Sequence, residues 1–342
     1  MLGRSDAGKR QTEVTTGISR YGFSFRLPPS AFLLAAALAA ASHAADYPAK
    51  PVRIVVPFAA GGGVDVTARI LGQQLSQRAG QSFVVENRTG ASGIIGVEYV
   101  AKSAPDGYTL LVGSQTTQAV VPAMYKVSYD TTRDFAAITE IARSPLLIVI
   151  HPSLPVKTVA DLIKLAKARP GQLSFGAASG GTPHLAGELF KLTAKVDLLF
   201  VPYKGEGPAI SDAMGGQISM VFSNLPVALP VAQSGRLRGI AVTSAQRVSM
   251  ARDIPTVAES GLPGYEAFTW FGFFAPGATP REIITKLNAE SAAGLNTSEV
   301  KEKMLGQGLF VTANAPDAFN QFVQKEIVRW GKIVKDAGVK PQ

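Results

Sequence analysis

The sequence predicts an α/β protein with mostly parallel sheets, helices on both faces of the sheets, and two domains. Short β-branched and aliphatic runs alternate with segments of helical spacing along most of the chain, a pattern typical of parallel strands covered by helices. Glycine-rich turns connect two of these runs to the helices that follow. The 342 residues are enough, even without a leader, for two domains that each bury a core.

The first 44 residues predict a leader that is not part of the fold. Basic residues are followed by an apolar run, Ala31–Leu38, and then by Ser42-His43-Ala44, with small residues where a signal peptidase cuts. We expect cleavage after Ala44 and export of the mature protein. No later apolar run approaches the roughly 20 residues that a membrane span needs. The chain has no cysteine, which excludes disulfides and a lipid-modified cysteine at the cleavage point.

The charge pattern gives no indication of nucleic-acid binding. The formal net charge is +9, but the lysines and arginines are scattered and form no stripe interleaved with aromatic residues. A solvated surface accounts for most of them. We therefore expect no nucleic-acid partner.

The mature chain begins with a strand, a glycine turn and a helix. Val52–Phe58 is a β-branched run, Gly61-Gly62-Gly63 is the turn, and the segment after Asp65 has helical spacing, with Asp65 as the expected N-cap. Glycines allow a ligand to approach the backbone, and the first amides of a helix attract anions. The turn therefore predicts a receptor for a small anion. The alternative is a plain connection, because most such turns bind nothing.

The rest of the first domain follows the same alternation. Ser114 ends a buried strand at the edge where sites of parallel sheets form. We place the crossing into a second domain at the strand 146–150, and the return at 268, so that the domains are 45–145 plus 268–342 and 146–267. The other elements expected before residue 170 are strands at 82–88 and 108–114 and helices at 94–103 and 159–168.

The second domain repeats the pattern of the first, in which a strand is followed by a loop of small residues and then by a helix. A strand ending at Gly176 leads into Ala177–Gly181, and Thr182 and Pro183 are expected to be the N-cap and the first residue of a helix. Two such loops, one per domain, could hold an anion between two helix N-termini. His184 is expected to cap or line its loop.

The last third of the chain contains an unusually aromatic segment, 268–276. We interpret it as core packing, and as the strand that returns the chain to the first domain. The remaining elements expected are strands at 198–205, 218–224 and 240–244 and helices at 280–295, 298–307 and 316–337.

Enzymatic interpretations find little support. A serine hydrolase built on Ser179 needs an acid and then a histidine later in the chain, and only His184 follows. The glycines do not fit the G-x-G-x-x-G spacing of a nicotinamide site, and there is no phosphate loop. His184 and Glu188, one helical turn apart, are too few ligands for a metal. We expect no catalytic residue, cofactor or metal.

Seven motifs occur in order across nearly the whole mature chain. They are Tyr47–Phe58 with Gly61, Gly62, Asp65, Ala68 and Arg69; Val85–Arg88; Ala104–Leu111; His184–Phe190; Val201–Gly205; Pro255–Tyr265; and Trp270–Gly272. Each motif is weak alone, but together they are highly specific. With these motifs the chain resembles Bug-type receptors, the periplasmic substrate-binding proteins of tripartite tricarboxylate transport systems.

The resemblance implies a two-domain periplasmic-binding-protein fold of type II, a Venus flytrap that closes on a small carboxylated solute. It implies a periplasmic monomer that delivers the solute to the membrane subunits of a tripartite tricarboxylate transporter. The alternative is a sensor that presents its closed form to a signalling partner. The ligand-binding residues it implies are Phe58, Gly61, Gly62, Gly63, Asp65, Ser114, Ala178, Ser179, Gly180, Thr182, His184, Tyr203 and Asn224.

The chain departs from the family pattern in its first loop. Ala59 and Ala60 stand where the family often has prolines, and Gly63 follows the glycine pair. Because proline restricts the unfolded backbone, this loop should order at a greater entropic cost.

We expect the hinges for domain closure at Ser144–Leu146 and Ala267–Trp270.

Overall fold

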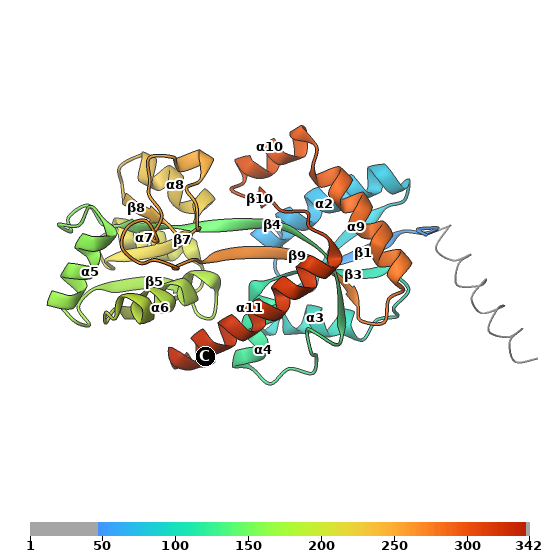
Figure 1. Cartoon of the computed structure of the whole chain (residues 1–342), viewed down its shortest axis with the longest axis horizontal. Helices are drawn as coiled ribbons and strands as arrows, with labels where there is room; N and C mark the ends of the chain where they lie inside the picture. Colours follow the sequence, from blue (N-terminus) through green and yellow to red (C-terminus); the bar gives the residue numbers. More distant parts are fainter. Residues whose placement is uncertain (1–46, 340–342) are drawn as a thin grey trace, which may run out of the picture. The chain divides into compact units, whose positions relative to one another are not determined.

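In the computed structural model, which describes residues 47–339, two long strands lie side by side (Figure 1). They are β4 (Phe135–Ile150) and β9 (Phe268–Pro276), and they pair antiparallel over residues 135–145 of β4. From Leu146 onward β4 pairs instead with β7 (Met220–Asn224) and β8 (Arg238–Val242), both antiparallel. A single strand therefore joins two groups of strands.

Parallel pairing occurs in two blocks. The first has the order β2 (Phe83–Asn87), β1 (Val52–Val56), β3 (Thr109–Ser114), and the second has the order β6 (Leu199–Tyr203), β5 (Ser174–Ala178), β7. The strands β4 and β9 run antiparallel to every strand they pair with, including the short β10 (Phe310–Val311). The class is α/β, as predicted, but the pairing is mixed rather than mostly parallel.

Helices cover both groups of strands. In the first group α2 (Gly63–Ala79) packs against β2 and α9 (Arg281–Leu295), and in the second α6 (Thr182–Ala194) packs against β5 and β7. The other helices are α3 (Ile94–Ala101), α4 (Val121–Met124), α5 (Val159–Ala168), α7 (Glu206–Met214), α8 (Leu225–Gln233), α10 (Ser298–Gly306) and α11 (Pro316–Asp336), and short 3₁₀ or π turns occupy Ala91–Gly93, Thr116–Val120 and Ser249–Ala251.

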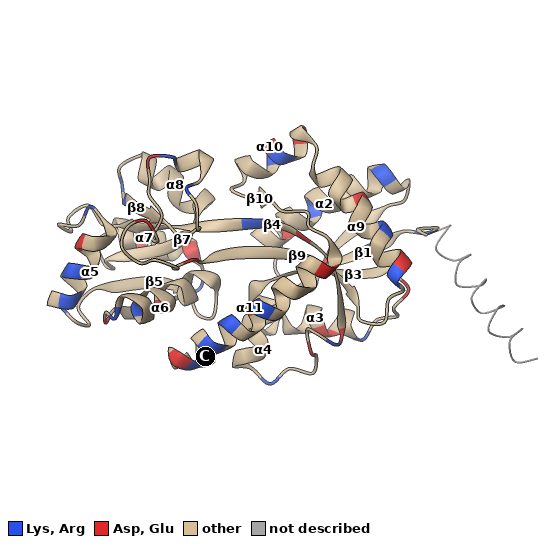
Figure 2. Ribbon diagram, in the orientation of Figure 1, with Lys and Arg blue, Asp and Glu red and all other residues tan. Residues whose placement is uncertain are grey.

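The predicted signal peptide and its cleavage site lie outside the described residues. By their contacts, the described residues 47–339 lie within one compact unit, so the division at 145 and 268 stays a prediction. None of the helices in residues 47–339 combines the length and hydropathy that a membrane span requires. Figure 2 shows charges of both signs on most helices, without an unbroken basic run along any described element.

The aromatic segment at 268–276 packs in the core, as predicted. Trp270 and Phe273 in β9 are fully buried, and Phe274 is 1% exposed. Phe319 of α11 meets the Trp270 ring edge-on, with the ring centroids 5.9 Å apart. Burying large rings along β9 gives this strand a strong hydrophobic anchor between β3 and β4.

Candidate ligand-binding site

The loop between β1 and α2 is held by one buried carboxylate. Gly61 has a φ of +85°, which favours glycine, and its amide donates to Asp65 Oδ2 at 2.9 Å. Asp65 is 2% exposed and also accepts from Asn87 Nδ2 at 2.9 Å and from the Arg69 guanidinium at 2.9 and 3.0 Å. Burial alone would raise the pKa of Asp65, but the hydrogen bonds from Arg69, Gly61 and Asn87 outweigh it and lower this pKa to about 2.

The N-caps of the two loop helices differ from the prediction. Asp65 is the third residue of α2, which begins at Gly63 with Gly62 as its N-cap. Thr182 is likewise the first residue of α6, and Gly181 is its N-cap. Both glycines are extended, with φ near −77°, and neither has a side chain to bond the helix. The first amides of each helix are therefore not covered by a capping side chain.

A cavity of about 360 Å³ opens at the N-terminus of α2. Elements from both groups of strands line it. Of the predicted ligand-binding residues, the structure brings Gly61, Gly62, Gly63 and Asn224 together on this cavity. The other lining residues are Val66, Ser144, Glu206, Pro226, Val227, Phe271, Gln307 and Leu309.

Three donors converge on the Glu206 carboxylate at one wall of the cavity. Ser223 Oγ donates to Oε2 at 2.5 Å, the Asn224 backbone amide donates to the same oxygen at 2.8 Å, and Asn224 Nδ2 donates to Oε1 at 2.5 Å. On its other side, Asn224 Oδ1 accepts from Thr269 Oγ1 of β9 at 3.1 Å. The Asn224 amide is thereby fixed in one orientation beside the cavity.

Ser144 lies on β4 just before that strand changes partners. It is 2% exposed and lines the cavity, and its hydroxyl has no hydrogen-bond partner within residues 47–339. A buried hydroxyl without a partner costs free energy. A polar ligand atom in the cavity would supply the missing partner.

The second predicted loop is closed by its histidine, as expected. The Gly180 amide donates to His184 Nδ1 at 3.0 Å, and the imidazole stacks on Phe200 with the ring centroids 3.7 Å apart. Burial, helped by the positive charge of Lys191, lowers the pKa of His184 to about 4. The ring is therefore neutral at pH 7, which suits its role as an acceptor.

The second loop does not line the cavity at α2 in the described structure. Its residues Ala178 and Ser179 lie at and after the end of β5, and a side chain at Gly180 would meet the sulfur of Met124 in α4 at 3.2 Å. The ligand-binding role of Ala178, Ser179, Gly180, Thr182 and His184 stays a prediction.

The three remaining predicted residues have structural partners near the sheet edges. The Phe58 carbonyl accepts from Asn87 Nδ2 at 2.9 Å, and the Ser114 amide donates to Thr117 Oγ1 at 3.1 Å. The Tyr203 hydroxyl donates to Asp212 Oδ2 at 2.7 Å, and burial together with this carboxylate raises the pKa of Tyr203 to about 12. None of the three lines the cavity among the described residues, so their part in binding is a prediction.

Ser144, Glu206 and Phe271 line the cavity without a sequence signal for ligand binding. The sequence predicts a hinge at Ser144 and core packing for Phe271. Glu206 directly follows the Val201–Gly205 motif, and that position was the available clue. Elsewhere in residues 47–339, no three His, Cys, Asp or Glu side chains gather closely enough to hold a metal ion.

Comparison with known proteins relates the whole described fold to one group. The profile described as the tripartite tricarboxylate transporter family receptor matches residues 67–339. Protein BugT of Bordetella pertussis (strain Tohama I) is 38% identical over 312 residues, which are 90% of this chain and 96% of the relative.

Two solved structures with bound ligands are also similar. The structure of R. palustris Rpa4515 with adipate has 41% sequence identity and a TM-score of 0.77, covering 87% of this chain and 100% of that chain. MatC (Rpa3494) from Rhodopseudomonas palustris with bound malate has 32% identity and a TM-score of 0.72, covering 84% of this chain and 100% of that chain.

Proposed function

We propose that this chain, which belongs to the tripartite tricarboxylate transporter family of receptors, captures a small carboxylated solute in the cavity at the N-terminus of α2. The predicted resemblance to Bug-type receptors and the α/β periplasmic-binding-protein fold are confirmed. Adipate and malate, which two relatives bind, are both small carboxylates, and this supports the ligand class.

The single observation that carries the proposal is the cavity wall formed by Gly61, Gly62 and Gly63. The Val66 amide donates to the Gly62 carbonyl, whereas the amides before it in α2 have no intrahelical acceptor. They carry the positive end of the helix dipole, which favours a carboxylate. The Ser144 hydroxyl adds a buried donor without a partner. No lysine or arginine lines the cavity in the described chain, so backbone and hydroxyl groups would hold the ligand.

We further propose that binding closes two domains, 45–145 plus 268–342 and 146–267. The change of partners along β4 at Pro145 and Leu146 supports a hinge there, because it separates the two groups of strands. Closure would bring the second loop, 178–184, toward the ligand held at α2.

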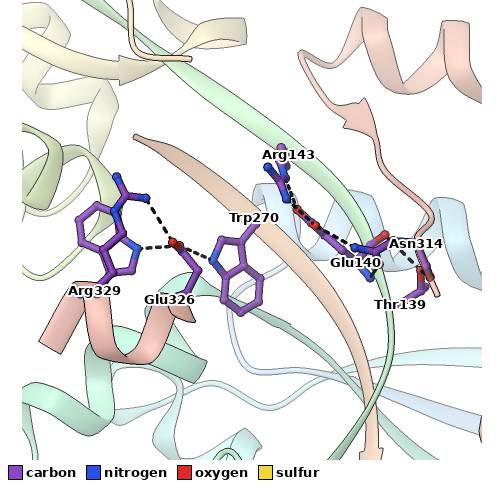
Figure 3. Close-up of polar contacts among 8 residues, drawn as sticks. Thr139, Glu140, Arg143, Trp270, Asn314, Glu326 and Arg329 are labelled. Atoms are coloured by element: carbon purple, nitrogen blue, oxygen red, sulfur yellow. Dashed lines mark hydrogen bonds and ion pairs between the residues drawn. The ribbon is translucent and has the colours of Figure 1, made fainter. Parts of the chain in front are cut away.

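The strands next to the proposed hinge are tied to neighbouring elements by buried polar groups (Figure 3). Glu326 of α11 accepts from Trp270 Nε1 at 3.0 Å and from Trp330 Nε1 at 2.7 Å. On β4, the Glu140 amide donates to Asn314 Oδ1 at 2.9 Å, which ties this strand to the segment before α11. Within β4, Arg143 Nη2 donates to Glu140 Oε2 at 2.9 Å, although burial still leaves the pKa of Glu140 raised. These contacts hold β4 just before Ser144 and β9 at Trp270, the last residue of the second proposed hinge. They support bending at Ser144–Leu146 and Ala267–Trp270, because the strands are held on the first-group side of both segments.

The place of action and the delivery step follow the family and the leader sequence. We propose a monomeric receptor that works in the periplasm after removal of residues 1–44, without catalysis. It would deliver its solute to the membrane subunits of a tripartite tricarboxylate transporter. The family's description supports this partner.

A thermal-shift panel of small carboxylates on the mature protein tests the ligand class. The protein is first denatured and refolded, which strips any solute carried from the cell. A true ligand at a hundred times its Kd should stabilise the fold by about 2.7 kcal/mol, a rise in Tm of several degrees. The proposal is wrong if di-, tri- and aromatic carboxylates all leave the Tm of the folded protein unchanged.

A further inference from the structure

The cavity contains a single charged side chain. Of the residues that line it in the described chain, Glu206 alone carries a charge. No lysine, arginine or histidine within residues 47–339 forms an ion pair with Glu206. Its carboxylate is instead held by neutral donors from β7. A negative charge without a cationic partner therefore faces the ligand space.

The geometry leaves Glu206 able to bind one more donor. An ionised carboxylate offers about four acceptor positions, and Ser223 and Asn224 use two on Oε2 and one on Oε1. One position on Oε1 is open. The three existing donors hold the carboxylate rigidly.

The opposite requirement holds where the N-terminus of α2 lines the cavity. The first amides of α2 have no intrahelical acceptor and no capping side chain, so they suit an anionic group. Elements from the two groups of strands supply these two parts of the lining, since α2 packs on β2 and α7 packs on β5 and β7. The cavity thus presents backbone donors on the α2 side and an acceptor with negative charge on the α7 side.

We infer that the cavity selects solutes that carry a carboxylate at one end and an ammonium or amide N–H group at the other, in preference to dicarboxylates. This inference rests on the proposed function and names the ligand class of the same site. Glu206 would attract the nitrogen group and repel a second carboxylate. It would act as a specificity-determining residue.

A purely structural role for Glu206 makes a different prediction. If Glu206 served only to fix Asn224 at the end of β7, its replacement would weaken all ligands alike. Glu206→Gln keeps the shape and removes the charge, and the Asn224 amide can turn to pair with the new amide. The ratio of affinities for two ligands that differ only at one end therefore distinguishes a role of Glu206 in ligand selectivity from a purely structural role.

The experiment uses matched ligand pairs on the mature protein at pH 7, with calorimetry for affinity and thermal shift for stability. The pairs are adipate with 6-aminohexanoate and succinate with 4-aminobutanoate, which match in chain length. In the unmodified protein, the amino member of at least one pair should bind about tenfold or more tightly than its dicarboxylate. Glu206→Gln should reduce that ratio by about tenfold or more.

Glu282→Gln is the matched control variant. Glu282 also lies in the first turn of a helix, α9, but it does not line the cavity. Removing its charge should leave the affinity ratio unchanged. A ratio that falls equally in both variants would overturn the inference, because a general field effect would then explain it.

The outcomes separate the two proposals. Tighter binding of the dicarboxylate in both pairs overturns this inference and leaves the proposed function standing. Binding of neither member of either pair, with the carboxylate panel also negative, overturns both. If Glu206→Gln does not fold, the comparison of matched pairs on the unmodified protein alone still decides the ligand class.

Discussion

At the scale of single residues, Asp65 is the clearest case of a side chain whose ionised form stabilises the fold. Its pKa is about 2 in the fold against an ordinary value of 3.8, so folding favours the ionised form. Asp65→Asn should therefore lower the free energy of unfolding by about 2 kcal/mol at pH 7, measured by urea denaturation. It removes the charge that binds Gly61, Arg69 and Asn87.

The pH dependence of this loss has a definite sign. Because the folded pKa is lowered, the stabilisation is complete above about pH 5 and is lost as the pH falls toward 2. The difference between the variant and the unmodified protein should shrink over that interval. Asp317→Asn, which breaks a fully exposed pair with Arg281, should cost nothing measurable. An Asp65→Asn loss that stays constant from pH 7 to pH 3 would contradict the assignment.

The residues of the candidate site could be predicted only where a local sequence pattern, such as a run of glycines, indicates an exposed backbone. Gly61–Gly63 stand out in the sequence because a glycine run before a helix lets a ligand approach the backbone amides, and they do line the cavity. The assignments of Asp65 and Thr182 as N-caps were wrong because glycines took the cap positions. Glu206 and Ser144 could not be predicted as site residues, since their place depends on pairings distant in sequence.

At the scale of elements, a side chain added at Gly62, in the turn from β1 into α2, should leave the fold stable but prevent ligand binding. Gly62 has extended backbone angles, and a Cβ there would meet only the Ala59 carbonyl oxygen, at 3.6 Å. We therefore expect Gly62→Val to keep the Tm within about 2 °C, since the backbone angles accept a Cβ without a close contact and the less favourable N-cap costs little in a protein of this size. Binding should fall by more than a hundredfold, because the side chain would block the loop amides.

Gly331→Val in α11 is a control for this prediction, because a Cβ at Gly331 meets nothing within 4 Å. It should change neither the Tm much nor the affinity. Calorimetry with any ligand found by the carboxylate panel gives the comparison. Wild-type affinity in Gly62→Val would show that the loop amides do not hold the ligand.

The elements with regular patterns were predicted well, and the others were missed for physical reasons. The helix at Val159–Ala168 and the strand at Phe268–Pro276 have the predicted bounds. The first half of β4 was missed because its buried face includes Thr139 and Glu140 and its register shifts twice, which breaks the apolar run. The helices α7 and α8 contain prolines or glycine, which hide helical spacing.

At the scale of the whole molecule, the order of motifs predicted the family, but the cavity needed the fold. Gly61–Gly63 and Asn224 are far apart in the chain, and they meet because β4 pairs with β9 on one side of Leu146 and with β7 on the other. The same geometry makes the crossing the natural place for a movement that links ligand binding to a partner. The division into two domains is therefore tested best by measuring the shape of the protein.

Small-angle X-ray scattering should show a smaller radius of gyration when a saturating ligand is added. The proposed closure would bring 45–145 plus 268–342 and 146–267 together around the cavity, whereas binding without closure would leave the radius unchanged. Tryptophan fluorescence gives a second readout in the same samples. The chain has two tryptophans, Trp270 and Trp330, and both donate to Glu326. Trp270 also lies at the proposed hinge. Gly62→Val should show neither change at the same ligand concentration. Calorimetry must first establish that the ligand binds. If the scattering is then identical with and without this ligand, closure is refuted, but capture of the ligand is not.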